Sequence, residues 1–405
     1  MSSSLPVIAE PADDAKVNSA GAVVEGLFWM IAVWFALIVA TTIALLSPGA
    51  LGAAHQVSFS RAVFTSFNAA TSTGFSQQFA DVESFAPFIR GMLNAEMIAG
   101  LWLSLIGGGL VLGKLLGEPV RLRTLFLITL LLTVAAAAAG LVTSQGDPVA
   151  AMLRGIAALA GAGPAQASHG WEGWRTPFVQ IPLAFVGSIG VLAWVAIRSA
   201  RPSLRRHIWN VLLLSACVYV GGLVLLGISF SGNPLDQLYL LLHGSRAEID
   251  FWSHANAQVF ASGGFGTPVD FASGWARDVV WTVMALSLIG IGTIGSVPSL
   301  GLGWFATLPR RFWQTILVLL GVQALIALLS FRILLVTEPQ LSSERILMLV
   351  VSAVAKTGLS HEAVSITGPG LILLGGLMGI SKLLPFGLLA GLICCRTPYL
   401  DPPQQ

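Results

Sequence analysis

The sequence predicts an all-α integral membrane protein in which four units of helix, re-entrant pore loop and helix surround one pore with fourfold pseudosymmetry. Three observations predict this fold. Of the 405 residues, 55% are hydrophobic and only 10% are charged, whereas soluble domains carry about 25% charged residues. Long apolar stretches alternate with shorter ones along the chain. A glycine follows every shorter stretch at a similar spacing.

The long stretches are the predicted spanning helices, because a helix needs about 20 apolar residues to cross a bilayer. Eight stretches qualify: 22–47, 91–116, 124–144, 178–198, 208–230, 278–308, 312–336 and 368–394. Four shorter apolar stretches alternate with them, at 58–73, 148–162, 247–263 and 342–357. Segments of this length are more often re-entrant than spanning. We therefore expect the order long, short, long to occur four times.

The glycines that follow the short stretches keep the repeat in phase. Aligning the chain on Gly74, Gly163, Gly264 and Gly358 gives spacings of 89, 101 and 94 residues, which indicates four divergent copies of one unit. The predicted organisation is a cytoplasmic tail, four pore units and a second tail, with bounds 1–21, 22–116, 117–198, 199–309, 310–394 and 395–405.

Loop charge predicts the orientation. Lysine and arginine gather in the loops 114–123, 198–207 and 309–311, and an excess of basic residues marks cytoplasmic loops. We therefore expect a multi-pass protein of the cell (inner) membrane with both termini cytoplasmic. The four short helices then enter from the outer side.

The net charge of +2 is too small to indicate a nucleic-acid partner.

A re-entrant helix followed by glycine is suited to binding a cation. The carboxyl end of a helix carries a partial negative charge. Glycine allows backbone angles that other residues resist, so that carbonyl groups can turn towards an axis and replace the hydration shell of an ion. Four such units around one axis predict a pore for cations.

The last long stretch of the third unit is interrupted by small residues and proline. Between 289 and 303 these residues are Gly290, Gly292, Gly295, Ser296, Pro298, Ser299, Gly301 and Gly303. Glycine and proline at this density break a helix. Irregular backbone at membrane depth is tolerated only inside protein or beside water. We therefore expect a broken helix over 289–303 that faces a cavity.

With these motifs the chain resembles the Trk/Ktr/HKT superfamily of potassium transporters. The resemblance rests on the long, short, long units, on Thr73–Ser76, Gly264–Phe265 and Val351–Ser360, and on the run 289–303, which is similar to that family's gating loop. It implies one pore per subunit, conduction of K⁺ and sometimes Na⁺, and a homodimer. It also implies regulation by a separate cytosolic nucleotide-binding subunit. Glycine in all four filters is the K⁺-selective pattern of that family.

The leading hypothesis is passive K⁺ uptake down the electrochemical gradient, with K⁺ as the transported ligand, no other cofactor, and the 290–303 loop as a gate. The ion would be coordinated by backbone carbonyl groups of Thr73, Gly74, Ala162, Gly163, Gly263, Gly264, Thr357 and Gly358. Two alternatives stay open, a coupled secondary transporter of another solute and a non-conducting sensor or scaffold on the same fold. An enzyme is not expected, because the sequence contains no nucleophile–base pair, metal cluster or nucleotide loop.

Three charged residues in the apolar stretches are candidate modulators of ion binding: Glu96, Lys356 and Lys382. Lys356 lies two residues before Gly358, where the family usually has a small or hydroxyl residue. Two interpretations are open: the side chain points away and caps its helix, or it weakens ion occupancy or acts as a tethered ion. Lys382 follows Gly379, near the position where the family commonly has an arginine. Glu96 is expected to pair with an arginine near the pore mouth.

Overall fold

The computed structural model describes most of units one, two and four. The described residues are 20–51, 56–75, 84–115, 120–143, 147–160, 181–197, 310–356, 364–366 and 368–394, with single residues at 179, 205, 208, 209, 212, 213 and 358. Every regular element within these ranges is a helix. Most of unit three lies outside the described residues, including the run 289–303 where the sequence predicts a broken helix.

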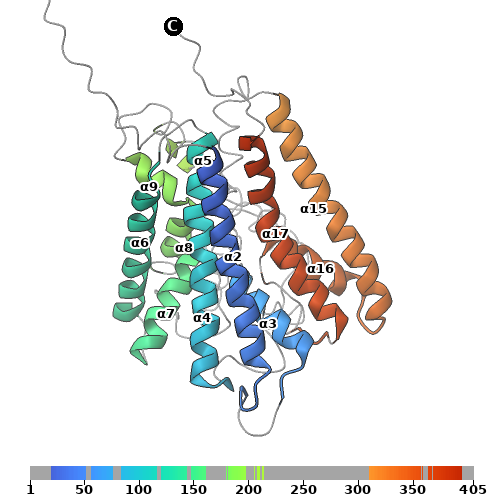
Figure 1. The fold of residues 1–405 in the computed structure, drawn as a ribbon. Helices are drawn as coiled ribbons and strands as arrows, with labels where there is room; N and C mark the ends of the chain where they lie inside the picture. Colours follow the sequence, from blue (N-terminus) through green and yellow to red (C-terminus); the bar gives the residue numbers. More distant parts are fainter. Residues whose placement is uncertain are drawn as a thin grey trace, which may run out of the picture.

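Unit one has the predicted order of a long, a short and a long helix. Helix α2 covers Ala20–Leu45 and the short helix α3 covers Phe59–Thr71. The second long segment consists of α4 (Pro87–Trp102), a π-helical turn η2 (Leu103–Gly107) and α5 (Gly108–Leu115). These three elements follow one another without a break in the chain. Figure 1 shows them as one rod beside α2.

Units two and four repeat this order. Unit two consists of α6 (Leu122–Thr143), α7 (Pro148–Ala160), α8 (Ile181–Ser188) and α9 (Val191–Ile197). Unit four consists of α15 (Arg310–Thr337), α16 (Ser343–Ala355) and α17 (Pro369–Cys394). The sequence predicts one helix over 178–198, whereas the structure has two. The break falls at Gly190, whose φ of 78° lies in the left-handed region, where glycine carries no steric penalty.

The three described short helices are alike in length and in the type of residue that precedes them. Each of α3, α7 and α16 has 13 residues, a rise of about 20 Å at 1.5 Å per residue, which is less than the roughly 30 Å of a bilayer core. Ser58, Asp147 and Ser342 precede them, which are residue types that favour helix starts. The Ala150 amide donates to the Asp147 carboxylate at 2.9 Å. The Arg345 amide donates to the Ser342 hydroxyl at 3.3 Å.

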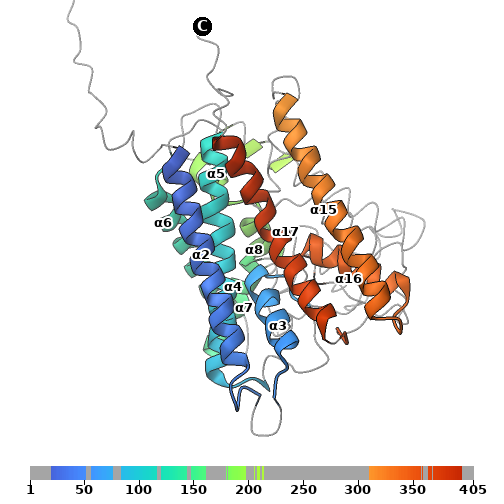
Figure 2. The same cartoon turned by 45° about the vertical axis from the view of Figure 1, so that its right-hand side comes forward.

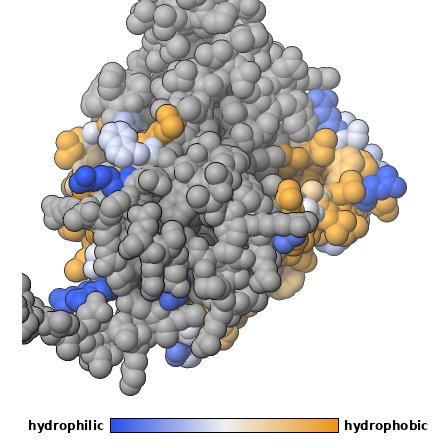
Figure 3. Space-filling view, turned by 90° about the horizontal axis from the view of Figure 1, so that it is seen from above, coloured by the Kyte–Doolittle hydropathy of each residue, from blue (hydrophilic) through white to orange (hydrophobic). Residues whose placement is uncertain are grey.

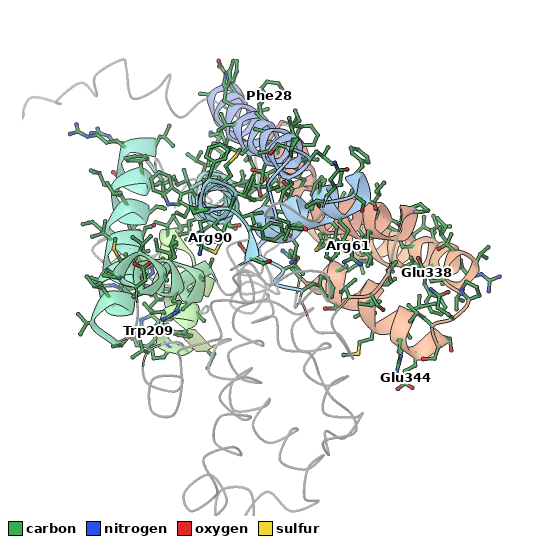
Figure 4. The ribbon with its side chains drawn as sticks, turned by 90° about the horizontal axis from the view of Figure 1, so that it is seen from below. Phe28, Arg61, Arg90, Trp209, Glu338 and Glu344 are labelled. Carbon is green, nitrogen blue, oxygen red and sulfur yellow. The ribbon has the colours of Figure 1, made fainter. Side chains whose placement is uncertain are left out.

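The first long helix of each described unit lies on the outside of the molecule. Large apolar side chains of α2, α6 and α15 are exposed, and Phe28 of α2 is 63% exposed and points away from the other helices (Figure 4). From above, hydrophobic side chains gather along the outer flanks of the described part (Figure 3). An exposed apolar surface of this kind fits a lipid environment.

Four helical segments within the described ranges are long and apolar enough to cross a membrane: Gly21–Leu45, Pro87–Lys114, Leu122–Thr143 and Pro369–Gly387. In the most apolar windows of the first and third segments, 28% and 33% of the residues are buried, against 72% and 50% in the second and fourth. The second long helices of units one and four therefore lie inside the molecule.

The short helix α3 lies between α2 and α17 in both ribbon views (Figure 1, Figure 2). Gly375 and Gly379 of α17 face the ring of Phe67 on α3, where a methyl group on Gly379 would lie 2.6 Å from the Phe67 ring. These small residues bring unit four against the short helix of unit one. Close approach at small residues is the usual way in which membrane helices pack.

A second kind of close contact occurs within unit one and again within unit two. In each unit it joins the short helix to the long helix that follows it. A methyl group on Gly100 of α4 would overlap the carbonyl oxygen of Ala70, and one on Gly187 of α8 would overlap that of Leu159. Ala70 and Leu159 are each the penultimate residue of their 13-residue helix. The two units are therefore related in packing as well as in the order of their helices.

We expect Gly100→Ala to destabilise the protein by about 1–3 kcal/mol, because the added methyl group overlaps backbone that cannot turn aside. Thermal unfolding of the purified protein in detergent would measure the change. Gly91→Ala is the matched control, because Gly91 lies on the same helix with no atom within 4 Å of an added methyl group. Equal melting temperatures for the two variants would contradict the close contact.

Candidate functional site: the paired glycine loops

The loop after α3 begins with a left-handed helix end. The Ser72 amide donates to the Ala69 carbonyl at 3.0 Å and the Thr73 amide donates to the Asn68 carbonyl at 3.1 Å, the hydrogen-bond pattern of a Schellman motif. Ser72 has a φ of 57° and Gly74 a φ of 78°. The chain thus reverses within three residues of the end of α3. Thr73 is completely buried at this turn.

The side chain of Asn68 holds this loop in place. Its amide nitrogen donates to the Phe75 carbonyl at 2.9 Å, and its oxygen accepts from the Phe75 amide at 2.9 Å. Both residues are buried. One side chain therefore satisfies both main-chain groups of the residue that follows Gly74. The sequence predictions give Asn68 no role. Its polar side chain inside the apolar stretch 58–73 was a signal that could have identified it.

Two described residues after α16 have left-handed φ angles, as do their counterparts after α3. Lys356 directly follows the helix and has a φ of 56°, and Gly358 has a φ of 64°. Ser72 and Gly74 hold the same places after α3. A left-handed conformation costs a non-glycine residue roughly 1–2 kcal/mol, and such strained residues cluster at functional sites. Lys356 thus ends its helix through its backbone, and the direction of its side chain stays a prediction.

The two loops come into direct contact, although they lie near opposite ends of the chain. A methyl group on Gly358 would overlap the Thr73 carbonyl oxygen and would lie 2.8 Å from the Gly74 carbonyl carbon. Only glycine fits at position 358, because its φ is left-handed and because a side chain would collide with the neighbouring loop. The structure therefore brings together three of the residues expected to bind the ion: Thr73, Gly74 and Gly358.

The end of α3 is tied to its neighbours by hydrogen bonds on either side. The Trp34 indole of α2 donates to the Ala70 carbonyl at 3.0 Å. The Thr71 and Thr73 hydroxyls lie 2.7 Å apart, and the Thr71 hydroxyl lies 3.9 Å from the Met378 sulfur of α17. The Ala70 carbonyl is consequently satisfied inside the protein. The polar atoms at the contact of the two loops are mainly main-chain carbonyls, which are suitable ligands for an alkali cation.

Glu96 of α4 contacts α3 through a buried hydrogen bond. The completely buried Ser66 of α3 has its hydroxyl 2.7 Å from Glu96 Oε1 and 3.0 Å from the Ile38 carbonyl oxygen of α2, so its single proton is shared between them. Among the described residues the hydrogen-bond partner of Glu96 is Ser66, and the expected pairing with an arginine stays a prediction. The other carboxylate oxygen of Glu96 and the Thr41 hydroxyl are buried without a hydrogen bond.

Lys382 lies in the middle of α17 and is only 8% exposed. It stands four residues after Met378, and residues four apart lie on the same face of a helix. Met378 is the residue of α17 that contacts Thr71 at the end of α3. Lys382 is therefore on the face of α17 turned towards α3, about one turn beyond the glycine loops.

Several residues of the expected site lie outside the described residues. They are the filter positions Ala162, Gly163, Gly263, Gly264 and Thr357, and the gate positions Gly290, Gly292, Gly295, Ser296, Pro298, Gly301 and Gly303. Of the four expected loops, the described residues therefore include that of unit one up to Phe75, and Lys356 and Gly358 of unit four.

We expect Asn68→Ala to free the loop, because the Phe75 amide and carbonyl lose their buried partners at a cost of about 1–3 kcal/mol for each unsatisfied group. Hydrogen–deuterium exchange of the Phe75 amide would measure the loosening, and thermal unfolding the loss of stability. Asn94→Ala is the control, because it removes only a local bond from Asn94 to the Arg90 carbonyl on the same helix. Unchanged exchange at Phe75 in Asn68→Ala would contradict the clamp.

Comparison with known proteins identifies a similar fold. No protein-family model matches the chain, and no curated protein matches its sequence. Among solved structures, the chain is similar to the crystal structure of the potassium transporter TrkH from Vibrio parahaemolyticus, with a TM-score of 0.63 and 17% identity over 93% of this chain and 86% of that one. The chain has a Trk-like fold, and the regular elements of its described part are helices.

Proposed function

We propose that this protein conducts K⁺ passively across the cell (inner) membrane through a filter built from its glycine loops. The observation that carries the proposal is the contact of Gly358 with the carbonyl groups of Thr73 and Gly74. Each of these loops follows a 13-residue helix and turns through a left-handed residue. This arrangement sets main-chain carbonyl groups of one repeat against the loop glycine of another.

Electrostatics favours a cation at this place. The carboxyl ends of α3 and α16 meet at the loops, and each helix end carries roughly half a negative charge. Carbonyl oxygens there can replace the hydration shell of a monovalent cation. A membrane potential supplies about 2.3 kcal/mol per charge for each 100 mV, which suffices to drive uptake without coupling to another solute.

The remaining parts of the pore belong to the same proposal. Loops two and three complete the ion site through Ala162, Gly163, Gly263 and Gly264, with Thr357 beside Gly358, and the 290–303 loop gates the pore on its cytoplasmic side. A homodimer and a separate cytosolic nucleotide-binding subunit complete the assembly. The Trk-like fold supports this extension, because the similar structure is that of a potassium transporter.

We expect purified protein in liposomes to take up ⁸⁶Rb⁺ along an imposed K⁺ gradient, and Gly358→Ala to abolish the uptake, because the methyl group displaces the Thr73 carbonyl. Gly321→Ala is the matched control, since Gly321 lies on the outer helix α15 with nothing within 4 Å of an added methyl group. Uptake that depends on a gradient of a second solute would favour the coupled transporter.

Thermal unfolding of Gly358→Ala would separate loss of conduction from loss of fold. The proposal is contradicted if folded wild-type protein takes up no ⁸⁶Rb⁺, or if folded Gly358→Ala takes it up as well as wild type does.

A further inference from the structure

Glu96 is a completely buried acid inside a segment long and apolar enough to span the membrane. Its exposed fraction is 0%, and it lies within Pro87–Lys114. Its Oε1 is hydrogen-bonded to the Ser66 hydroxyl, and its Oε2 is buried without a hydrogen bond. An ionised carboxylate at membrane depth is costly unless it is paired and hydrogen-bonded. The surroundings of Glu96 therefore favour its neutral, protonated form.

The helices that pack around Glu96 carry few charged residues. Helix α4 packs against α2, α3 and α7. Apart from Glu96, the charged residues of these four helices are Glu25, Arg61, Arg90 and Arg154. Among the described residues, none of these side chains is hydrogen-bonded to either carboxyl oxygen of Glu96. The contacts of Glu96 in the described part of the chain are therefore those of a neutral acid.

The two contacts of the Ser66 hydroxyl are complete hydrogen bonds only if two hydrogen atoms are available. Ser66 Oγ lies 2.7 Å from Glu96 Oε1 and 3.0 Å from the Ile38 carbonyl oxygen. A serine hydroxyl has one hydrogen, a carbonyl group has none, and a carboxyl group has one only when it is protonated. With a proton on Oε1, Glu96 donates to Ser66 and Ser66 donates to Ile38. An ionised Glu96 instead competes with Ile38 for a single hydrogen.

These contacts form part of a ladder that joins α2, α3 and α4. The first rung consists of one residue from each helix: Ile38, Ser66 and Glu96. The second rung lies four residues away along each helix and consists of Trp34, Ala70 and Gly100. In the second rung the Trp34 indole donates to the Ala70 carbonyl at 3.0 Å, and Gly100 lets α4 approach the same carbonyl. Residues four apart share a helix face, so the two rungs are one turn apart.

The second rung lies directly before the loop of the proposed filter. Ala70 is the penultimate residue of α3, and Thr73 and Gly74 follow in the loop. Asn68, which lies between the two rungs on α3, binds both main-chain groups of Phe75 beyond the loop. A displacement of α3 at the first rung is therefore passed on to the carbonyl groups of Thr73 and Gly74.

We propose that Glu96 is a proton-binding site, and that its proton, donated to Ser66, holds the short helix α3 where the filter requires it. The proton is a structural ligand and does not travel with K⁺. Glu96 is thus a positioning residue, which acts on the ion through α3. The inference excludes the ion pair with an arginine that the sequence predicts, because such a pair keeps Glu96 ionised. Its part that concerns conduction rests on the proposed K⁺ function.

Four variants separate the proton from the side chain that holds it. Glu96→Gln replaces the acid with an amide, which donates a hydrogen bond to Ser66 at every pH. Glu96→Met keeps a side chain of similar length and removes the donor. Ser66→Ala removes the acceptor. Glu25→Gln is the matched control, because Glu25 is exposed on α2.

Infrared difference spectra between the wild-type protein and Glu96→Gln test the proton directly. The C=O stretch of a protonated carboxyl group is separate from the bands of a carboxylate, and it shifts in D₂O. At neutral pH we expect this band in the wild-type protein and in Glu25→Gln, and its loss in Glu96→Gln. In Ser66→Ala the band moves to higher frequency, because the carboxyl group has lost its hydrogen bond.

⁸⁶Rb⁺ uptake into liposomes tests whether the proton positions α3. At neutral pH we expect Glu96→Gln to conduct as the wild-type protein does. Uptake by Glu96→Met is about tenfold lower, the order expected for the loss of one buried hydrogen bond. As pH rises, the ratio of wild-type uptake to that of Glu96→Gln follows the intensity of the infrared band. The two fall together if the proton leaves, and both stay constant if it is retained.

Three results would overturn the inference. The first is a neutral-pH spectrum in which Glu96 gives only carboxylate bands, as an ion pair with an arginine would. The second is equal uptake by Glu96→Met and Glu96→Gln. The third is an uptake ratio that changes with pH while the band stays constant, or the reverse. The proposed function fails separately, if wild-type protein takes up no ⁸⁶Rb⁺, and the infrared spectra then still decide whether Glu96 holds a proton.

Discussion

The rest of the structure depends on the contact between Gly358 and the carbonyl groups of Thr73 and Gly74. This contact joins the turns that follow α3 and α16, two helices of 13 residues each. It requires left-handed turns directly after them, and Ser72 and Lys356 adopt these turns in spite of their side chains. It leaves no room for any side chain at position 358. The carbonyl groups of one repeat are thereby held against the loop of another.

The surrounding helices act as a frame that fixes α3. Trp34 holds the last turn of α3 from α2, Ser66 links it to Glu96 of α4, and Gly100 lets α4 approach the Ala70 carbonyl. Asn68 then fixes the loop itself. Polar side chains thus hold the backbone in place, and main-chain carbonyl groups are left to bind the cation. Such a division suits an ion filter, where carbonyl positions decide binding.

Much of this arrangement follows from the sequence, because hydropathy and glycine phase are local signals. They predict the long and short helices of the described units and the equivalence of Gly74 and Gly358. The partner of Glu96 was not predictable, because Ser66 lies on another helix and only the packed fold brings the two together. The break at Gly190 was missed, since this glycine resembles the packing glycine Gly187 and only the backbone angles separate them.

The central claim is that the glycine loops hold a monovalent cation. A crystal structure of the protein in Rb⁺, with anomalous scattering measured at the rubidium edge, tests this claim most directly. The account predicts an anomalous peak among the carbonyl groups of Thr73, Gly74 and Gly358. Peaks confined to carboxylates or to the surface, with none at the paired loops, would contradict it.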